Sequence, residues 1–412
     1  MYMSFVEISA VQKQTLNEKL EWTIDAIKSG LEKVQSRAGL AFSGGKDSTV
    51  LWHILRTYFS NETKDMAVIF GNTGVEFPES LIFARKIGKE WGGSNFYEAK
   101  PNKIQKASLK YKAQVGVLKW LEETGQLEQV LKKDGKLKST EIIDKVCPPD
   151  MWAEFEKRNL VWKAGKIKDY WWCVDQYGYP ILGKAASKLK ARRINIDTFL
   201  KYSETTSEKE DLKQYYEILK NSKISQACCD ILKKEPSEAL QAKLGIDVIF
   251  KGLMAAESEK RKLNFSFRGP LFESNRKYLS TPFYHCNPIS LWTDEDIWEY
   301  IHKYNVPFSE LYNMTYRCEK DGTEKKITRN GCVGCYTGYG RKNGQMYVLR
   351  QTHPKRWKHI MQSGMAKEIT GLKQTEKYKP NSSNYHRTAI LQSIFDDEQL
   401  ERIIDDRPCA FD

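Results

Sequence analysis

The 412-residue sequence lacks any run of about 18 consecutive apolar residues, so no segment is expected to span a membrane. Its first seven residues lack a basic stretch followed by an apolar one, and they do not indicate a secretory signal peptide. Long low-complexity tracts and internal repeats are also missing. Together these absences predict a globular, soluble protein of the cytoplasm.

Acidic residues are fewer than basic ones: 53 Asp and Glu stand against 66 Lys and Arg, which gives a net charge of +13. Such a charge favours polyanionic partners, namely nucleotides and nucleic acid, although it also serves solubility alone. Hydrophobic residues make up 40% of the chain, which allows a large buried core. The length predicts two or three domain-sized units.

Alternating strand and helix patterns predict an α/β fold with a doubly wound, mostly parallel sheet. Short apolar runs that stop at Gly, Ser or Asn are typical of buried parallel strands, and apolar positions at helical spacing indicate the helices between them. The expected elements are a helix over 12–35, a strand at 38–42, a helix from 49, a strand at 66–70, a helix over 79–91 and a strand at 247–250.

The alternation breaks between residues 101 and 224, where the sequence is Lys-rich, aromatic and helical in its spacing. We interpret this segment as a helical insertion that divides the sheet domain. The expected organisation is an N-terminal helix with the first half of the sheet domain (1–100), the insertion (101–224), the second half of that domain (225–300), and a helical C-terminal region with a cysteine-containing loop (301–412).

A glycine-rich turn joins the first strand to its helix and reads Ser43, Gly44, Gly45, Lys46, Asp47, Ser48. The glycines let the backbone approach phosphate oxygens, and the amides at the start of the following helix point at the anion. Lys46 adds positive charge, and Asp47 is suited to hold Mg²⁺ beside the phosphates. Ser43 and Ser48 can donate hydroxyl hydrogen bonds. The longer Walker spacing G-x-x-x-x-G-K is absent, so the loop predicts a different kind of nucleotide site.

This loop resembles the PP-loop of the ATP pyrophosphatases, or adenine-nucleotide α-hydrolase-like proteins. Three further segments resemble the phosphoadenosine phosphosulfate (PAPS) reductase branch: GNTGVEFPE at 71–79, Gly252 followed by ESEKR at 257–261, and NPISLWTDEDIW at 287–298. The resemblance covers residues 38–100 and about 225–360, and it leaves the insertion and the last fifty or so residues unmatched.

The resemblance implies a site for ATP, PAPS or adenylyl sulfate (APS). It puts Asn72, Thr73 and Glu76 over the nucleotide, and Arg261 against a phosphate or sulfate. A guanidinium suits such an anion because it binds oxygen pairs through two parallel hydrogen bonds. The alternative for Arg261 is an exposed charge among charged neighbours.

Four of the nine cysteines form a C-C pair and a C-x-x-C pair, Cys228-Cys229 and Cys332/Cys335. In a chain without a secretory signal, such spacing indicates a metal or catalysis more often than disulfides. Four thiolates can hold a [4Fe-4S] cluster or tetrahedral zinc. The pairing resembles that of cluster-containing APS reductases, which favours the cluster, and structural zinc and buried thiols are the alternatives.

The remaining cysteines give weaker signals. Thiol-dependent PAPS reductases carry a nucleophilic cysteine in a C-terminal tail motif that this sequence lacks, which leaves Cys409 as the candidate nucleophile. Cys318 lies near the C-x-x-C pair and is a candidate extra ligand or sulfur relay. Cys147, Cys173 and Cys286 have no partner at a diagnostic spacing and are expected to be core or surface thiols.

Aromatic and basic side chains alternate in the insertion, and a second basic group follows the C-x-x-C pair. Such interleaving suits nucleic acid, because bases stack on aromatic rings while phosphates meet the cations. An aromatic core with a solvated basic face explains the pattern equally well. The residues are Trp162, Tyr170, Trp171, Trp172, Tyr177, Tyr179, Lys184, Lys188, Lys190, Arg192 and Arg193, and then Arg341, Lys342, Lys355, Arg356 and Lys358.

The favoured hypothesis is an enzyme that cleaves ATP to AMP and pyrophosphate, adenylating an acceptor for sulfur insertion. Lys46, Asp47 and Arg261 would act in catalysis. The acceptor would be nucleic acid, as in enzymes resembling the DNA-phosphorothioation sulfurtransferases, and the sulfur would come from a donor such as a cysteine desulfurase. Three features favour this hypothesis: the intact Lys46, the missing tail motif and the basic aromatic insertion. A homodimer is compatible with it.

Two other functions stay open. One is a thiol-dependent PAPS or APS reductase that releases sulfite, with Cys409 as the nucleophile. The other is a cluster-bearing regulator that binds nucleic acid and has kept a nucleotide site without catalysis.

Overall fold

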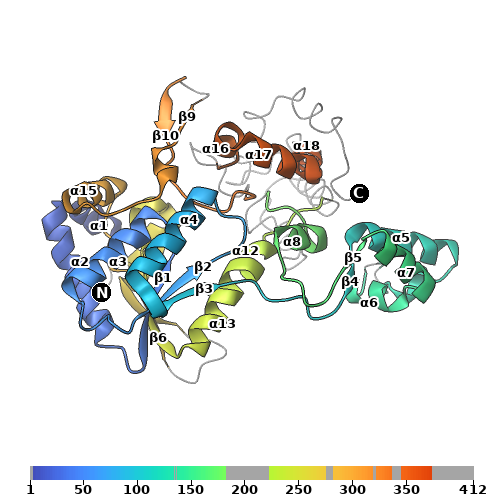
Figure 1. Ribbon diagram of the computed structural model, residues 1–412, viewed down its shortest axis with the longest axis horizontal. Helices are drawn as coiled ribbons and strands as arrows, with labels where there is room; N and C mark the ends of the chain where they lie inside the picture. Colours follow the sequence, from blue (N-terminus) through green and yellow to red (C-terminus); the bar gives the residue numbers. More distant parts are fainter. Residues whose placement is uncertain are drawn as a thin grey trace, which may run out of the picture. The chain divides into compact units, whose positions relative to one another are not determined.

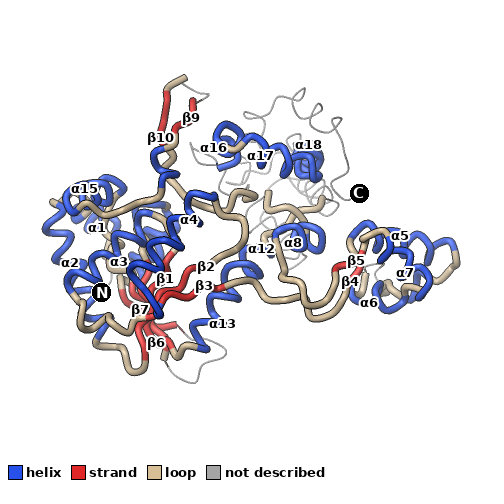
Figure 2. Tube along the Cα trace, in the orientation of Figure 1, coloured by secondary structure: helices blue, strands red, loops and turns tan. Residues whose placement is uncertain are grey.

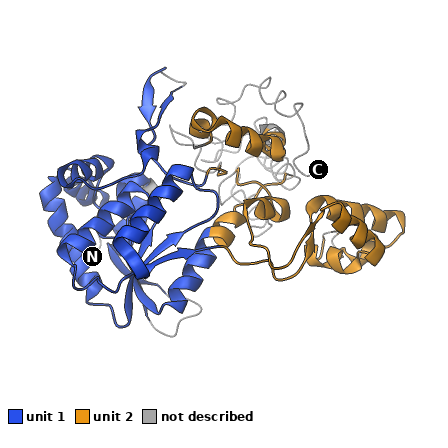
Figure 3. Cartoon of the chain, in the orientation of Figure 1, with its two compact units in different colours: residues 1–100, 233–332 blue, residues 101–232, 333–412 orange. Residues whose placement is uncertain are grey.

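The structure is a computed structural model that describes residues 3–133, 135, 137–181, 222–274, 282–318, 322–335 and 345–373. The chain divides into two compact units (Figure 3). Unit 1 comprises residues 1–100 and 233–332, and unit 2 comprises residues 101–232 and 333–412. No helix in the described part of the chain is both long and apolar enough to cross a membrane.

A six-stranded sheet in the order β3-β2-β1-β6-β8-β7 forms the centre of unit 1 (Figures 1 and 2). Its neighbouring strands are parallel except for β7, which runs antiparallel to β8. The predicted mostly parallel, doubly wound sheet is therefore confirmed. The strands are β1 (Arg37–Phe42), β2 (Ala67–Gly71), β3 (Phe96–Ala99), β6 (Ile246–Lys251), β7 (Leu271–Ser274) and β8 (Phe283–Cys286).

Helices cover both faces of this sheet. On one face, apolar residues of α2, α3, α4 and α15 pack in one core with β1, β2 and β6. On the other face, Leu240 of α13 and Leu244, directly after that helix, belong to a smaller core with Ile69 and Ile249. The helices of unit 1 are α1 (Phe5–Val11), α2 (Leu16–Leu31), α3 (Lys46–Tyr58), α4 (Pro78–Ile87), α13 (Glu235–Lys243), α14 (Glu259–Arg268) and α15 (Asp294–Tyr304), and a hairpin of β9 (Thr315–Arg317) and β10 (Glu324–Lys326) follows them.

Several helix boundaries differ from the sequence expectation: the helix expected from 49 begins at Lys46, and the helix expected over 12–35 ends at Leu31. Two further differences have local explanations. The helix expected over 12–35 begins at Leu16, because Thr15 and Glu18 form a capping box in which the Thr15 N–H donates to the Glu18 carboxylate at 2.8 Å. The helix expected over 79–91 ends as α4 at Ile87 and continues as a π-helical turn, η1 (Gly88–Gly92), before the short turn η2 (Gly93–Asn95).

Unit 2 is mainly helical in its described residues. The helices α5, α6 and α7 enclose a core of their own with Leu109, Val117 and Ile143. The elements are β4 (Ser108–Leu109), α5 (Tyr111–Glu123), α6 (Thr140–Val146), α7 (Pro149–Lys157), β5 (Val161–Trp162), α8 (Tyr170–Tyr177), α12 (Ala227–Cys229), α16 (Gln345–Thr352), α17 (Pro354–Ile360) and α18 (Ala366–Lys373).

Candidate functional site

The glycine-rich loop follows β1 at the point where the strand order of the sheet reverses. β1 pairs with β2 on one side and with β6 on the other. Ligands of doubly wound sheets bind outside the carboxyl ends of the strands at such a reversal. Gly252, directly after β6, approaches the loop so closely that a Cβ there would lie 2.9 Å from the backbone of Asp47. The topology thus brings two distant glycine segments together at one edge.

Glycine and serine define the shape of the loop. Gly44 has a φ of +69°, a left-handed conformation that costs other residues about 1–2 kcal/mol. A Cβ at Gly44 would also lie 2.8 Å from the Cβ of Ala84 in α4. The hydroxyls of Ser43 and Ser48 lie 3.0 Å apart in a hydrogen bond, and the Ser48 hydroxyl donates to the Gly45 carbonyl. The loop is therefore held in shape by its own side chains.

Lys46 lies between two carboxylates. Its side chain is buried, and its Nζ contacts Asp47 Oδ1 at 2.6 Å and Asp294 Oδ1 at 2.5 Å. Because both oxygens meet one ammonium, they lie close enough to share one cation. Mg²⁺ is commonly bound through one or two carboxylates together with substrate phosphates, so this donor set fits a magnesium–nucleotide complex. Asp294, the first residue of α15, was not selected from the sequence.

Two other residues that the sequence did not reveal also contact the loop. The buried Tyr312 hydroxyl accepts a hydrogen bond from the backbone N–H of Lys46 at 3.2 Å, and Asn330 Nδ2 donates to the Ser43 carbonyl at 3.2 Å. Burial, and then the charge of Asp47, raise the pKa of Tyr312, so its hydroxyl stays neutral. These partners are 266 and 287 residues apart in the sequence, which is beyond the reach of any spacing pattern.

The residues predicted to cover the nucleotide form a tight turn after β2. The Thr73 N–H and hydroxyl both donate to Glu76 Oε1, at 2.9 and 2.5 Å. Asn72 Oδ1 accepts from the Gly74 N–H at 3.0 Å, and Asn72 Nδ2 donates to Glu98 at 3.1 Å. All three predicted residues therefore shape this turn, at the edge of the sheet where the PP-loop also lies.

Arg261 belongs to a small ion cluster at the start of α14. Its guanidinium pairs with Glu257, and Arg329 pairs with the same carboxylate at 3.3 Å. The Ser258 hydroxyl caps the helix by accepting from the Arg261 N–H. Two guanidiniums against one carboxylate leave a net positive charge, which is the sign that an anionic substrate requires.

The four cysteines predicted to share a metal are divided between the units. Cys332 is the last residue of unit 1, where its Sγ lies 3.7 Å from Thr73 Oγ1. Cys228, Cys229 and Cys335 belong to unit 2. Within the described ranges, no group of three or more His, Cys, Asp or Glu side chains is arranged to hold a metal ion. The four-cysteine metal site stays a prediction.

A further thiol accompanies the C-C pair in unit 2. A hydrogen bond with Cys229, then burial, then the charges of Cys229, Cys335 and Cys173 raise the pKa of Cys228. Cys173 lies in α8, against which α12 packs, and Tyr170 of the same helix donates to the Gly334 carbonyl at 3.0 Å. Within unit 2, helix α8 therefore contacts both the C-C pair of α12 and Gly334, the residue before Cys335, a relation that no spacing signal could reveal.

Several candidates lie outside the described residues, namely Cys409, Lys184, Lys188, Lys190, Arg192, Arg193, Arg341 and Lys342. Among the described aromatic residues of the insertion, Tyr170, Trp172 and Tyr179 are buried, whereas Tyr177 is exposed. Burial raises the pKa of Tyr179 to about 12. These three rings serve the core of unit 2.

The profile of the phosphoadenosine phosphosulfate reductase domain matches residues 37–143 and 179–337, which is more than half of the chain. The chain belongs to this family. The match contains the PP-loop, the turn after β2 and both cysteine pairs. It also reaches into the insertion, which the sequence resemblance had left unmatched.

Two curated relatives carry different names. Sulfate adenylyltransferase subunit 2 of Shewanella amazonensis is 27% identical over 141 residues, which are 26% of this chain and 47% of that protein. Adenosine 5′-phosphosulfate reductase of Staphylococcus epidermidis is 26% identical over 203 residues, which are 48% of this chain and 71% of that protein. The chain thus spans about half the length of the first relative.

A crystal structure of phosphoadenylyl-sulfate reductase from Candida auris, in complex with phosphate, is similar over 76% of this chain and 93% of that chain, with 12% identity and a TM-score of 0.31. The names of the two curated relatives include both an adenylyltransferase and a reductase, so family membership leaves the reaction open.

Proposed function

We propose that this member of the PAPS reductase family is an ATP pyrophosphatase that adenylates an acceptor for sulfur insertion. The observation that carries the proposal is Lys46, whose ammonium is held by Asp47 and Asp294 at the PP-loop. A lysine and two carboxylates are what a magnesium-bound triphosphate requires. A sulfonucleotide without β- and γ-phosphates has less use for them.

In the proposed reaction, an acceptor oxygen attacks the α-phosphorus of ATP. The bond from the α-phosphorus to the bridging oxygen breaks, pyrophosphate leaves, and the acceptor becomes an AMP ester. The persulfide of a donor protein, such as a cysteine desulfurase, then displaces AMP, and a thiol cleaves the resulting disulfide between acceptor and donor and is itself oxidised to a disulfide. The products are the sulfur-bearing acceptor, AMP and pyrophosphate.

The side chains divide the work. Asp47 and Asp294 would hold Mg²⁺, which would neutralise phosphate charge, and Lys46 would supply a positive charge to the phosphates. The backbone of the Gly44–Gly45 turn approaches the phosphates closely because neither residue has a Cβ. Arg261 and Arg329 supply positive charge toward the anionic substrate.

We further propose nucleic acid as the acceptor. The support is the net charge of +13 and the basic, partly aromatic insertion. This choice predicts that nucleic acid stimulates pyrophosphate release and that the stimulation declines steeply with salt.

The cysteine pairs are proposed to hold a [4Fe-4S] cluster, with Cys228, Cys229, Cys332 and Cys335 as ligands. The donor set suits it, since thiolates are the usual cluster ligands and Cys228 interacts with both Cys229 and Cys335. No step of the proposed reaction depends on the cluster. Iron, zinc and acid-labile sulfide analysis of anaerobically purified protein tests it: zinc without iron would replace the cluster with a structural zinc site.

A second candidate function is APS or PAPS reduction with Cys409 as the nucleophile. It is favoured by the relative from Staphylococcus epidermidis, of whose length 71% is matched. In that reaction the thiol attacks the sulfur of the sulfonucleotide, the nucleotide leaves, and a second thiol releases sulfite as a disulfide forms.

One anaerobic experiment separates the candidates. The full-length protein is incubated with ATP, with PAPS and with APS, each with Mg²⁺ and a thiol reductant, and pyrophosphate and sulfite are followed. Pyrophosphate from ATP, stimulated by DNA or RNA, is the expected result. Sulfite from PAPS or APS without ATP cleavage would overturn the proposal, and loss of that sulfite in Cys409→Ser would establish the nucleophile.

A further inference from the structure

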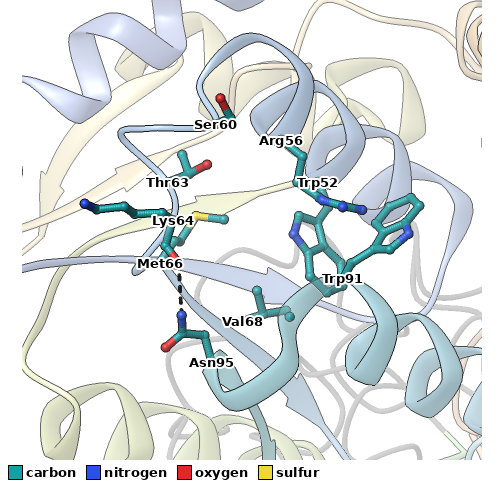
Figure 4. A pocket seen from close by; sticks show the side chains of 10 residues that line it. Trp52, Arg56, Ser60, Thr63, Lys64, Met66, Val68, Trp91 and Asn95 are labelled. Atoms are coloured by element: carbon teal, nitrogen blue, oxygen red, sulfur yellow. Dashed lines mark hydrogen bonds between the residues drawn. The ribbon is translucent and has the colours of Figure 1, made fainter.

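A pocket of about 210 Å³ lies near the carboxyl-terminal end of α3 in unit 1 (Figure 4). Its walls come from α3, the loop after it, the start of β2, and the turns η1 and η2. In Figure 4, Trp52 and Trp91 lie on one side of the pocket and Thr63, Lys64 and Met66 on the other. Nothing in the proposed reaction uses this pocket.

The pocket is separate from the PP-loop. α3 starts at Lys46, and Arg56 of the pocket follows ten residues later, which corresponds to about 15 Å along a helix. Met66 and Val68 line the pocket from the amino end of β2, whereas the PP-loop lies at the carboxyl ends of the strands. A ligand here would therefore occupy the opposite edge of the sheet.

Two tryptophans form a rigid aromatic wall. The rings of Trp52 and Trp91 meet edge to face, with centroids 5.4 Å apart. Trp52 is held from behind by Phe42, at 5.0 Å, and only 2% of it is exposed. Trp91 is only partly buried. The Trp91 ring, braced by the buried Trp52, thus offers π surface without a cost in side-chain entropy.

Positive charge at the pocket has no acidic counterpart among the described residues that line it. The Arg56 guanidinium lies 4.7 Å from the ring centroid of Trp91, and Lys64 stands on the opposite wall. Burial lowers the pKa of Arg56, and burial together with the Arg56 charge lowers the pKa of the neighbouring His53. The Asn95 side-chain amide donates a hydrogen bond to the Lys64 carbonyl at 3.0 Å, which fixes the backbone on that side of the pocket.

We propose that this pocket binds one nucleobase of a single-stranded nucleic acid, with the adjoining phosphate against Arg56 and Lys64. Indole surface with flanking cations suits a flat base joined to an anion, and such stacking tolerates any base. The described lining contains no acidic residue, which disfavours cationic ligands. The volume lies below the range of drug-sized pockets, so it suits a single ring system. A free nucleotide shares this chemistry and is distinguished by the test.

The first test measures binding of a fluorescein-labelled oligothymidylate to the full-length protein by anisotropy, because thymine avoids competition for the adenine site. The double variant Arg56→Gln/Lys64→Gln should weaken binding at least about fivefold. The control Lys13→Gln/Lys86→Gln removes the same charge from exposed positions of unit 1 and should change binding less than about twofold. Equal losses in both doubles would mean unspecific attraction and overturn the proposal.

The second test asks whether a base enters the pocket. Irradiation of the protein with a 5-iodouracil oligonucleotide should attach the base to the peptide that contains Trp91 or Trp52, as read by mass spectrometry. Ser60→Trp, which fills the pocket from an exposed position, should abolish this adduct, whereas Ser60→Ala should keep it. Adducts elsewhere only, or an adduct that survives Ser60→Trp, would overturn the proposal. Equal labelling by free 5-iodouridine monophosphate would assign the pocket to a free nucleotide and overturn the proposal that it binds a nucleic-acid strand.

Discussion

The two ends of α3 differ in how their cations are paired. At the amino-terminal end, the Lys46 ammonium lies within 2.6 Å of two carboxylates. At the carboxyl-terminal end, Arg56 rests on the ring of Trp91, and the described lining of the adjacent pocket has no acidic residue. Lys46, which is paired with carboxylates, can exchange these partners for phosphate when a metal–nucleotide complex binds. Arg56, which has no acidic partner in the described lining of the pocket, is suited to bind an anion directly. We infer that α3 places the proposed catalytic site at its amino-terminal end and the proposed nucleic-acid-binding pocket at its carboxyl-terminal end.

The largest effect is expected from Lys46→Ala, which removes the cation from the reactive end. Loss of a group that stabilises developing charge typically lowers rates by about 100- to 1000-fold, so pyrophosphate release should fall by that amount. Oligothymidylate binding should stay within about twofold, because Arg56 and Lys64 remain. Retained pyrophosphate release would contradict the role of Lys46, and lost binding would contradict the separation of the two ends.

A second prediction concerns Asp294→Asn. It keeps the shape of the side chain but removes one of the two carboxylates at Lys46, so the Mg²⁺ concentration for half-maximal activity should rise about tenfold. Glu299→Gln changes an exposed carboxylate on the same helix and serves as the control. The measurement is a titration of activity with Mg²⁺. An equal Mg²⁺ concentration for half-maximal activity in both variants would show that Asp294 is not part of the metal site.

Each end of α3 also has a glycine in a left-handed conformation nearby, Gly44 with φ +69° and Gly93 with φ +51°. At Gly93, where ψ is −124°, a Cβ would meet nothing within 4 Å, so Gly93→Ala should lower the free energy of unfolding by about 1–3 kcal/mol through backbone strain alone and leave ATP binding unchanged. Gly44→Ala adds a close contact with Ala84 and should cost about 2–3 kcal/mol and weaken ATP binding. Urea denaturation measures the stability of each variant, and ATP titration measures its ATP binding. Equal losses of stability and of ATP binding in the two variants would show that the loop tolerates a Cβ.

The smallest effect concerns His53, which packs beside Arg56. Burial, and then the Arg56 charge, lower the pKa of His53 below its usual value, so Arg56→Gln should raise this pKa without restoring it fully. Because the folded pKa is the lower one, the unfolded chain takes up the proton first. The contribution of His53 to stability is therefore present above an unfolded pKa of about 6.5 and is lost as pH falls through the folded pKa.

An NMR titration of the His53 ring in the parent protein and in Arg56→Gln measures the shift. The free energy of unfolding of the parent should decline more steeply than that of Arg56→Gln as pH drops below about 6.5. An unchanged His53 pKa would mean that another group already neutralises Arg56, which would weaken the contrast between the two ends.

Much of unit 1 could be predicted from local patterns. The order of strand, glycine turn and helix around 43–48, the strand at 247–250 and the mostly parallel sheet all follow from residue types at short range. The roles of the predicted site residues stay predictions, although Lys46 and Asp47 do lie at the reversal of strand order. Tyr312 and Asn330 escaped detection because each reaches the loop from a segment more than 260 residues away.

The cysteines illustrate the same limit. Spacing alone joined Cys332 and Cys335 into one motif, whereas the structure assigns Cys332 to unit 1 beside Thr73 and Cys335 to unit 2. Spacing also left Cys173 without a partner, although the packing of α12 on α8 brings it into electrostatic contact with Cys228.

The sequence by itself determined the local chemistry of this protein: a glycine that tolerates a left-handed turn, a lysine and an aspartate after it, and buried strands on each side. These properties depend on a few adjacent residues and their intrinsic conformational preferences. Only the tertiary structure decided that Asp294 shares Lys46 with Asp47, and that Trp52, Arg56, Lys64 and Trp91 line one pocket. Such partners are chosen by strand order and helix packing, which depend on the whole core at once.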